Sequence, residues 1–141
     1  MTATTRARPR SLPSTTTKLS TEYGSLFVTV SVDEDGEPFE VFGHLGKAGS
    51  FQHGVTELAC RLISLHLRRG TPLEEVIEQM QGIQEMQPFW NRLGDGRSVP
   101  VQGLGDGIAH ILKAHLKAKE ERETAGVEAV NRPHERFGTR R

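Results

Sequence analysis

The stretch Ser25-Leu-Phe-Val-Thr-Val-Ser-Val32 decides the fold class of this chain. β-Branched residues dominate it, and the apolar side chains of Leu26, Val28 and Val30 alternate with an opposite face that includes Phe27. Alternation with a period of two is typical of a strand that buries one face. The stretch therefore predicts a β-strand.

A second strand follows directly along the chain. The segment Asp33-Glu-Asp-Gly36 is typical of a turn, because its glycine accepts a positive φ angle. The alternation resumes over residues 37–43, so the two strands are predicted to form a β-hairpin. Whether a third strand joins the hairpin stays open at this point. An isolated hairpin is only marginally stable in water, so its apolar face must be covered.

Three predicted helices supply this cover. The first runs from residue 51 to 69 and carries an apolar stripe with steps of four and three residues. The members of the stripe are Phe51, Val55, Leu58, Leu62 and Leu65, and Ala59, Cys60, Ile63 and Leu67 widen it into a broader apolar arc. We expect the stripe to lie on the hairpin. Two more helices are predicted, over residues 72–81 and 106–123. The predicted fold class is therefore α+β, a hairpin packed on three helices with disordered basic tails.

The net charge of zero hides an uneven distribution. The 141 residues hold 18 Lys and Arg against 18 Asp and Glu, yet residues 1–20 contain four basic residues and no acidic one. Both ends of the chain are poor in large apolar residues, so they cannot bury enough surface to offset chain entropy. The predicted organisation is a disordered basic tail over residues 1–20, a folded domain over 21–123 and a flexible basic tail over 124–141.

The composition excludes several classes of site. A single cysteine, Cys60, rules out a disulfide framework within the chain and any zinc or iron–sulfur site built from several thiolates. No histidine pair has ligand spacing and no nucleophile–base arrangement is visible, so no metal site, cofactor or catalytic residue is predicted. No apolar run reaches the roughly 18 residues of a membrane-spanning helix, and no secretory signal is visible. These features predict a cytoplasmic protein without membrane contact.

A glycine-rich loop before the first helix is a weak candidate for anion binding. Its residues Gly46, Lys47, Gly49 and Ser50 combine a flexible backbone, a helix N-terminus and a lysine, which together are able to hold a single phosphate. The commoner explanation of such a loop is a tight turn with a helix cap at Ser50.

The basic tail and an aromatic residue are weak candidates for partner binding. Arg6, Arg8 and Arg10 suit contact with nucleic acid or an acidic protein, and Trp90 lies in a region, residues 84–104, that shows no sustained period. A solubilising tail is the alternative that we favour, because so few charges spread over 20 residues make a weak patch.

Five segments occur in an order and spacing that resemble a known family. They are Gly24-Ser-Leu-Phe-Val-Thr-Val, Gly36-Glu-Pro-Phe-Glu-Val-Phe, Leu45-Gly-Lys-Ala-Gly-Ser, Arg61-Leu-Ile-Ser-Leu-His-Leu-Arg-Arg-Gly and Asp106-Gly-Ile-Ala-His-Ile-Leu. Together they resemble the TSCPD domain, which lies at the C-terminal end of adenosylcobalamin-dependent (class II) ribonucleotide reductases and also occurs in free-standing proteins. The resemblance covers the chain from Tyr23 to about Leu116.

The resemblance also implies cysteines that this chain lacks. The family is expected to carry thiols at four places, which here read Thr21-Glu-Tyr23, Phe51-Gln52, Gln84-Glu-Met86 and Gly103-Leu-Gly-Asp106. A metal or redox role of those thiols therefore does not carry over. A ribonucleotide reductase also needs a large catalytic barrel that 141 residues cannot contain. We expect no autonomous activity, although the kinship is to ribonucleoside-diphosphate reductase.

Three functions stay open on this basis. The first hypothesis is a non-catalytic binding or adaptor module that acts through protein or nucleic-acid contacts. The second is an accessory component of ribonucleotide reduction, and so of DNA synthesis, that is supplied in trans to a separate reductase chain. The third is a small-anion or nucleotide sensor that uses the loop from Gly46 to Ser50.

Overall fold

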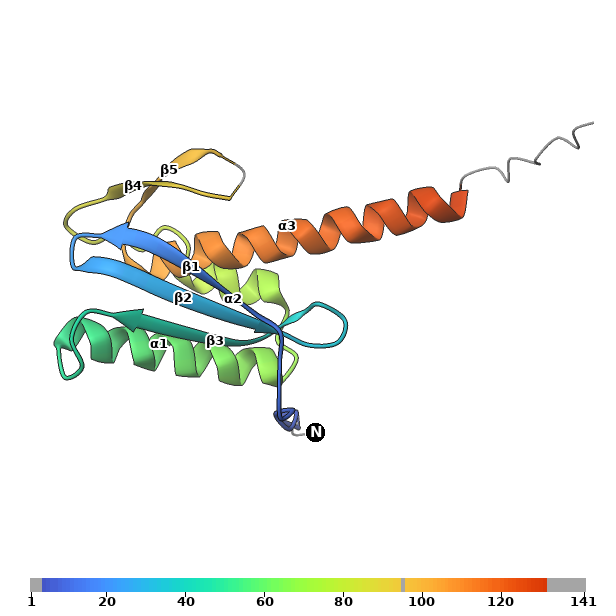
Figure 1. Cartoon of the computed structure of the whole chain (residues 1–141), viewed down its shortest axis with the longest axis horizontal. Helices are drawn as coiled ribbons and strands as arrows, with labels where there is room; N and C mark the ends of the chain where they lie inside the picture. Colours follow the sequence, from blue (N-terminus) through green and yellow to red (C-terminus); the bar gives the residue numbers. More distant parts are fainter. Residues whose placement is uncertain (1–3, 95, 132–141) are drawn as a thin grey trace, which may run out of the picture.

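A computed structural model describes residues 4–94 and 96–131, with side chains up to residue 127. Its centre is an antiparallel sheet in the order β1-β2-β3, formed by β1 (Ser14–Thr21), β2 (Gly24–Val32) and β3 (Pro38–Leu45) (Figure 1). The predicted hairpin is β2 and β3, in which Val30 lies opposite Val41. The α+β prediction is confirmed, and the strand left open is β1.

The formation of β1 corrects the prediction of a disordered tail over residues 1–20. Residues 14–21 pair with β2, so that Leu19 lies opposite Leu26 and is fully buried. The other inward positions of β1 are small and polar, and hydroxyl pairs such as Thr16 with Thr29, at 2.8 Å, join the strands on the outer face. Backbone pairing and one apolar anchor suffice at an edge strand, so low hydrophobicity did not prevent a strand here.

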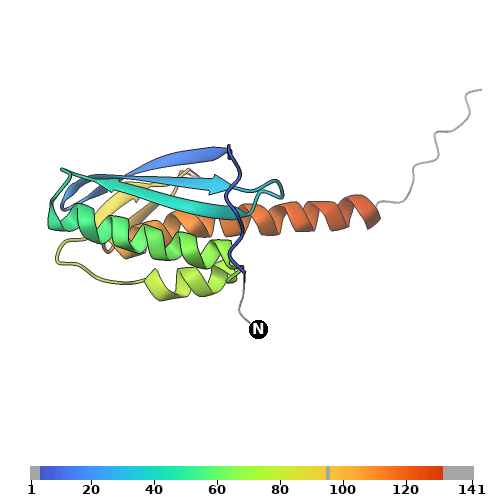
Figure 2. The same cartoon turned by 90° about the horizontal axis from the view of Figure 1, so that it is seen from below.

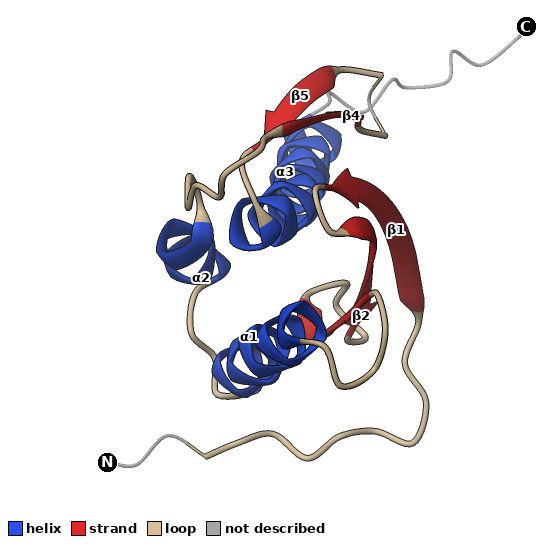
Figure 3. Cartoon of the chain, turned by 90° about the vertical axis from the view of Figure 1, so that its left-hand side faces the viewer, coloured by secondary structure: helices blue, strands red, loops and turns tan. Residues whose placement is uncertain are grey.

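The three helices lie on one face of the sheet, as Figures 2 and 3 show. Helix α1 (Phe51–Arg68) packs along β3, and α2 (Leu73–Met80) packs against α3 (Leu104–Asn131). The core between helices and sheet is apolar, with fully buried side chains at Leu26, Val28, Leu45, Ile108 and Leu112.

Helix α1 turns only one side of the predicted apolar arc toward the core, the side with Cys60, Ile63 and Leu67. The buried residues of α1 are Thr56, Cys60, Ile63 and Leu67, whereas the predicted stripe from Phe51 to Leu65 is exposed. The reason lies in β3, where Gly43 lets the helix approach closely. A Cβ atom at position 43 would come within 2.7 Å of the Thr56 Cγ2 atom and 2.9 Å of the Cys60 sulfur. The small side chains of Thr56 and Cys60 therefore lie against Gly43, and the leucines of the predicted stripe face outward.

A second, short hairpin occupies the region in which no period was visible. Strands β4 (Phe89–Arg92) and β5 (Ser98–Val101) pair with each other and lie beside the edge of β1. Asn91 makes that junction, because its side-chain amide accepts from the Ser20 backbone N–H at 2.8 Å and donates to the Ser20 carbonyl at 3.0 Å. The hairpin thereby covers part of a free sheet edge.

Helix α3 is longer than predicted and extends past the sheet (Figure 1). It continues to Asn131, so the prediction of a flexible tail over residues 124–141 is wrong for residues 124–131. The rest of that predicted tail, residues 132–141, lies outside the described residues. Gly126 does not stop the helix, since a single glycine costs only about 1 kcal/mol relative to alanine. No helix in the described part of the chain is long and apolar enough to span a membrane.

Candidate functional site

The outer face of α1 is the most prominent apolar surface of the described molecule. Five residues form it, Phe51, Val55, Leu58, Leu62 and Leu65, and we call them the α1 stripe. Phe51 is 81% exposed, Leu58 61% and Leu62 54%. The opposite face of the helix already fills the core, so the fold does not need the stripe. Large contiguous apolar patches on a protein surface are typical of interaction sites.

The stripe continues into a groove between α1 and α2. The groove has a volume of about 430 Å³ and is lined by Ala59, Leu62 and Ile63 from α1 and by Val76 and Met80 from α2. Its walls are mostly apolar, with Glu75 and Gln79 at the rim on α2. Apolar grooves between helices are suited to binding the apolar face of another helix.

Charged residues flank the stripe on the side away from α2. Glu57 and Arg61 form an ion pair at 2.7 Å, and both side chains are largely exposed. Such a pair on a helix surface contributes little to stability, about 0.3–0.5 kcal/mol. The pair lies beside the middle of the stripe, where its two opposite charges are placed to orient a docked partner.

A more polar groove runs along the free edge of β3. Ser64 of α1 closes part of this edge, because its hydroxyl accepts from the Val41 backbone N–H and donates to the Val41 carbonyl, both at 3.0 Å. His53 lines the same groove and contacts Glu57 at 3.9 Å. Its ring also meets that of His44 edge-on, with 5.2 Å between the ring centroids. Cys60 and Ser64 also line this groove, but the Ser64 hydroxyl is bound to the Val41 backbone and the His53 Nδ1 atom has no hydrogen-bond partner among the described residues, so these groups form no catalytic pair.

Three of the four places expected to carry thiols come together in the structure. Glu85, after α2, accepts a hydrogen bond from the Leu104 backbone N–H at the start of α3. Tyr23, in the turn between β1 and β2, also interacts with Glu85. The pKa of Tyr23 is raised to about 12, chiefly by its hydrogen bond to Glu22, then by desolvation and by the charges of Glu22 and Glu85. The fourth place, Phe51, opens the α1 stripe instead.

These replacements leave no metal centre at that place. Within the described residues, no three His, Cys, Asp or Glu side chains are grouped so that they could hold a metal ion. The Glu85 carboxylate fills the space beside Gly103, where even an added Cβ atom would collide with it. A carboxylate hydrogen-bonded to backbone thus occupies this position, and its effect is to join the loop after α2 to α3.

Asp106 completes this junction. It is buried, and its carboxylate accepts from the Gly82 backbone N–H at 2.8 Å and from the Gln102 backbone N–H at 2.9 Å. His110 lies one helical turn further on, with its Nε2 atom 3.3 Å from the same carboxylate. Asp106 therefore fixes the end of α2, the exit from β5 and the start of α3 relative to one another.

The single cysteine is a packing residue. Cys60 is 3% exposed and lies against Gly43 of the sheet. Burial raises the pKa of its thiol to about 11, so the reactive thiolate form is scarce at neutral pH.

The residues of the predicted anion loop form a turn and a helix cap. Ser50 is the N-cap of α1, and its hydroxyl accepts from the His53 backbone N–H at 3.2 Å. Gly46 and Gly49 have positive φ angles, which explains the two glycines, and Lys47 is exposed. The Ser50 hydroxyl is therefore already used as the helix cap. Anion binding at this loop stays a prediction.

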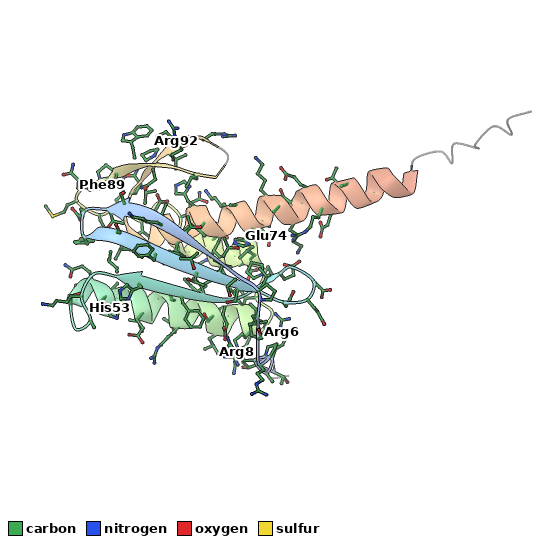
Figure 4. All side chains as sticks on the ribbon, in the orientation of Figure 1. Arg6, Arg8, His53, Glu74, Phe89 and Arg92 are labelled. Carbon is green, nitrogen blue, oxygen red and sulfur yellow. The ribbon has the colours of Figure 1, made fainter. Side chains whose placement is uncertain are left out.

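The candidates for partner binding do not form one surface. Arg6 pairs with Asp33 at 3.0 Å, and the Arg8 Nε atom donates to both carboxylate oxygens of Glu40, at 2.9 and 3.0 Å. Arg10 and Trp90 are exposed. Figure 4 shows Arg6 and Arg8 on the segment before β1, residues 4–13, which we call the N-terminal arm, well apart from the strand that carries Phe89, Trp90 and Arg92. Two of the tail arginines are thus engaged within the chain.

Sequence reasoning identified the stripe but assigned it to the core. The signal that points outward was present in the spacing, because Phe51, Val55, Leu58, Leu62 and Leu65 alternate steps of four and three throughout. A period of 3.5 residues is typical of a helix that pairs with another helix, whereas packing on a sheet needs no such regularity.

Comparison with known proteins gives one match. A family model, described as the TSCPD domain, matches residues 2–116 of the chain. The match includes β1 and the N-terminal arm, which lie before the region of resemblance identified from the sequence. No curated protein and no solved structure matches the chain.

Proposed function

The chain belongs to the TSCPD domain family, and from this premise we propose that it is a non-catalytic protein-binding module. The observation that carries the proposal is the α1 stripe, an apolar surface that the fold leaves uncovered. Asp106 and Glu85 hold the junction where the resemblance implies thiols. The feature of this chain that points to a function is therefore a surface rather than a reactive group.

Protein contacts have better support than nucleic-acid contacts. Arg6 and Arg8, which gave the N-terminal tail half of its positive charge, form ion pairs with Asp33 and Glu40. A nucleic-acid site depends on several free cations that neutralise phosphates. The exposed apolar side chains of α1 offer nothing to a phosphate backbone, but they match the apolar face of a protein partner.

The proposal is tested by comparing which proteins different variants capture. The tagged full-length chain, Leu58→Glu and Phe42→Glu are each incubated with native extract, and bound proteins are identified by mass spectrometry. Phe42→Glu is the matched control, because Phe42 is 53% exposed on the outer face of the sheet. We expect a partner that binds the wild type and Phe42→Glu but not Leu58→Glu. An identical set of bound proteins for wild type and Leu58→Glu, with both variants folded by circular dichroism, contradicts the proposal.

A role beside a ribonucleotide reductase is a second candidate, favoured by the family match. In this case the partner bound at the stripe is a separate reductase chain. Turnover of that reductase is measured with wild-type protein, with Leu58→Glu and without either. A change in rate or effector response that only the wild type produces supports this candidate, and equal turnover in all three reactions rejects it.

A further inference from the structure

We propose that the α1 stripe binds α1 of a second copy of this chain, with the two helices antiparallel about a two-fold axis near residue 60. The proposal rests on the proposed function, because it names the occupant of the same surface. The occupant is a helix, since the stripe alternates steps of four and three over five positions. That spacing forms the seam of paired helices, in which each side chain fits between those of the opposite helix.

Four of the five stripe residues are placed symmetrically about position 60, and only Phe51 has no apolar counterpart. Leu58 and Leu62 are equally distant from position 60, and so are Val55 and Leu65. In an antiparallel pair centred there, Leu58 meets Leu62 of the second copy and Val55 meets its Leu65. One patch then serves both partners, as a two-fold interface requires.

Charges near the axis favour the antiparallel arrangement. Glu57 and Arg61 lie on the same side of the stripe and on either side of its centre. Antiparallel pairing brings Glu57 beside Arg61 of the second copy, and the reverse, so that four charges alternate around the axis. Parallel pairing would instead bring Arg68 beside His66 of the second copy. Antiparallel helices also align their dipoles favourably.

The groove beside α2 supplies a matching receptor. It lies along the C-terminal half of α1, where Leu62 and His66 face Val76 and Met80. In the antiparallel register, the N-terminal half of the second α1 runs past this groove. Phe51 of the second copy, the most exposed residue of the stripe, is thereby brought to the groove together with Val55. The symmetry repeats the contact, so both grooves of about 430 Å³ are occupied.

The extent of the surface sets the strength that we expect. An 18-residue helix is about 27 Å long, and one helix face with an adjoining groove lies near the lower limit of specific interfaces, about 1,200 Å² in total. The dimer should therefore be reversible and dissociate on dilution. Sedimentation velocity of the full-length protein over a wide concentration series is expected to show a monomer–dimer equilibrium.

Substitutions on and away from the stripe test whether it forms the dimer interface. Leu62→Glu should weaken dimerisation by about a hundredfold or more, because it buries an unpaired charge. Phe42→Glu, on the outer sheet face, should leave the equilibrium unchanged. Glu57→Arg should weaken the dimer. Glu57→Arg combined with Arg61→Glu should restore it, because the four charges around the axis still alternate after their signs are exchanged. A dimer of unchanged strength in Leu62→Glu overturns the proposal.

Cysteine cross-linking tests the direction of the helices. Leu58→Cys and Leu62→Cys proteins are mixed under mild oxidation, while the native Cys60 is buried and does not compete. The antiparallel pair is expected to give a mixed disulfide between the two variants and little product from either one alone. Disulfides that form within each variant alone, as parallel helices would give, overturn the proposed geometry.

The outcomes separate this inference from the proposed function. A wild-type protein that stays monomeric throughout the concentration series overturns the inference. If Leu58→Glu then still loses a captured protein that Phe42→Glu retains, the proposed function stands, with a helix of another protein on the stripe. If the wild type dimerises through the stripe and no other protein depends on it, the inference stands and the wider binding role is rejected.

Discussion

At the scale of single residues, Asp106 joins separate segments of the chain through its side chain. Its buried carboxylate accepts backbone hydrogen bonds from two segments, at Gly82 and Gln102, that approach α3 from different directions. Both carboxylate oxygens are needed for this, because each accepts from one donor. Asp106→Asn keeps the shape but offers only one acceptor, so one N–H faces an amide NH₂ group.

We expect Asp106→Asn to lower the free energy of unfolding by about 1–3 kcal/mol, the usual cost of an unsatisfied buried donor. Urea denaturation followed by circular dichroism measures it. Asp35→Asn is the matched control, because Asp35 is exposed at the turn between β2 and β3, and its effect should stay within about 0.5 kcal/mol. Equal stability of Asp106→Asn and the control would show that water replaces the lost contact.

At the scale of elements, α1 makes the clearest prediction, because neighbouring residues differ sharply in burial. Ile63 is buried in the core at 6% exposure, while Leu62 is 54% exposed. Ile63→Ala should lower the free energy of unfolding by about 2–5 kcal/mol. Leu62→Ala should cost less than about 1 kcal/mol, since little buried surface is lost. Urea titration at a concentration where the protein is monomeric gives both values, and the reverse order would contradict the assigned faces.

The same helix shows why sequence reasoning located the elements better than their faces. The sequence predicts one wide apolar arc on α1, in which the stripe and the residues Cys60, Ile63 and Leu67 all face the core. The face that the structure buries includes Thr56 and Cys60, which rank lower in hydrophobicity but fit against Gly43. That choice depends on a contact between residues far apart in sequence. The spacing of the stripe is typical of a helix that pairs with another helix, but the contact with Gly43 decides which side of α1 is buried.

The site was predictable only in part, for a related reason. The positions where the resemblance implies thiols could be named from the sequence, but their replacement by the Glu85–Leu104 contact needed the tertiary structure. Likewise, the charges of Arg6 and Arg8 were visible in the sequence, whereas their carboxylate partners, 27 and 32 residues away, were not. Strand β1 was missed because it depends on pairing with β2 rather than on its own apolar content.

At the scale of the whole molecule, the N-terminal arm is held to the far end of the sheet. Arg8 is 44% exposed, but the Glu40 side chain that it binds is only 5% exposed. Arg8→Ala leaves this buried carboxylate without its cation, and we expect a loss of about 1.5–3 kcal/mol in the free energy of unfolding, as for other hydrogen bonds to charged groups. Thermal and urea denaturation both report it. Arg10→Ala, an exposed arginine on the same arm, is the control and should change stability by less than about 0.5 kcal/mol.

A second ion pair of the N-terminal arm, between Arg6 and Asp33 in the turn between β2 and β3, predicts that the stability of the protein depends on pH. Partial burial acts to raise the pKa of Asp33, but hydrogen bonds from the Arg6 side chain and from the backbone N–H groups of Glu37 and Asp35 outweigh it and lower the pKa below its usual value. A carboxyl whose pKa is lower in the folded state stabilises the protein above its unfolded pKa, about 3.9. This contribution is lost as the pH falls through the folded pKa.

The difference in unfolding free energy between wild type and Asp33→Asn should therefore be constant from pH 7 to about pH 5 and shrink as the solution is acidified further. Asparagine can still accept the turn hydrogen bonds through its side-chain oxygen, so the variant removes chiefly the charge that faces Arg6. High salt should reduce the difference at neutral pH, because the Arg6 side chain is about half exposed and the pair is open to screening. A difference that grows on acidification would mean that the folded state holds Asp33 protonated and that the arm is attached by other contacts.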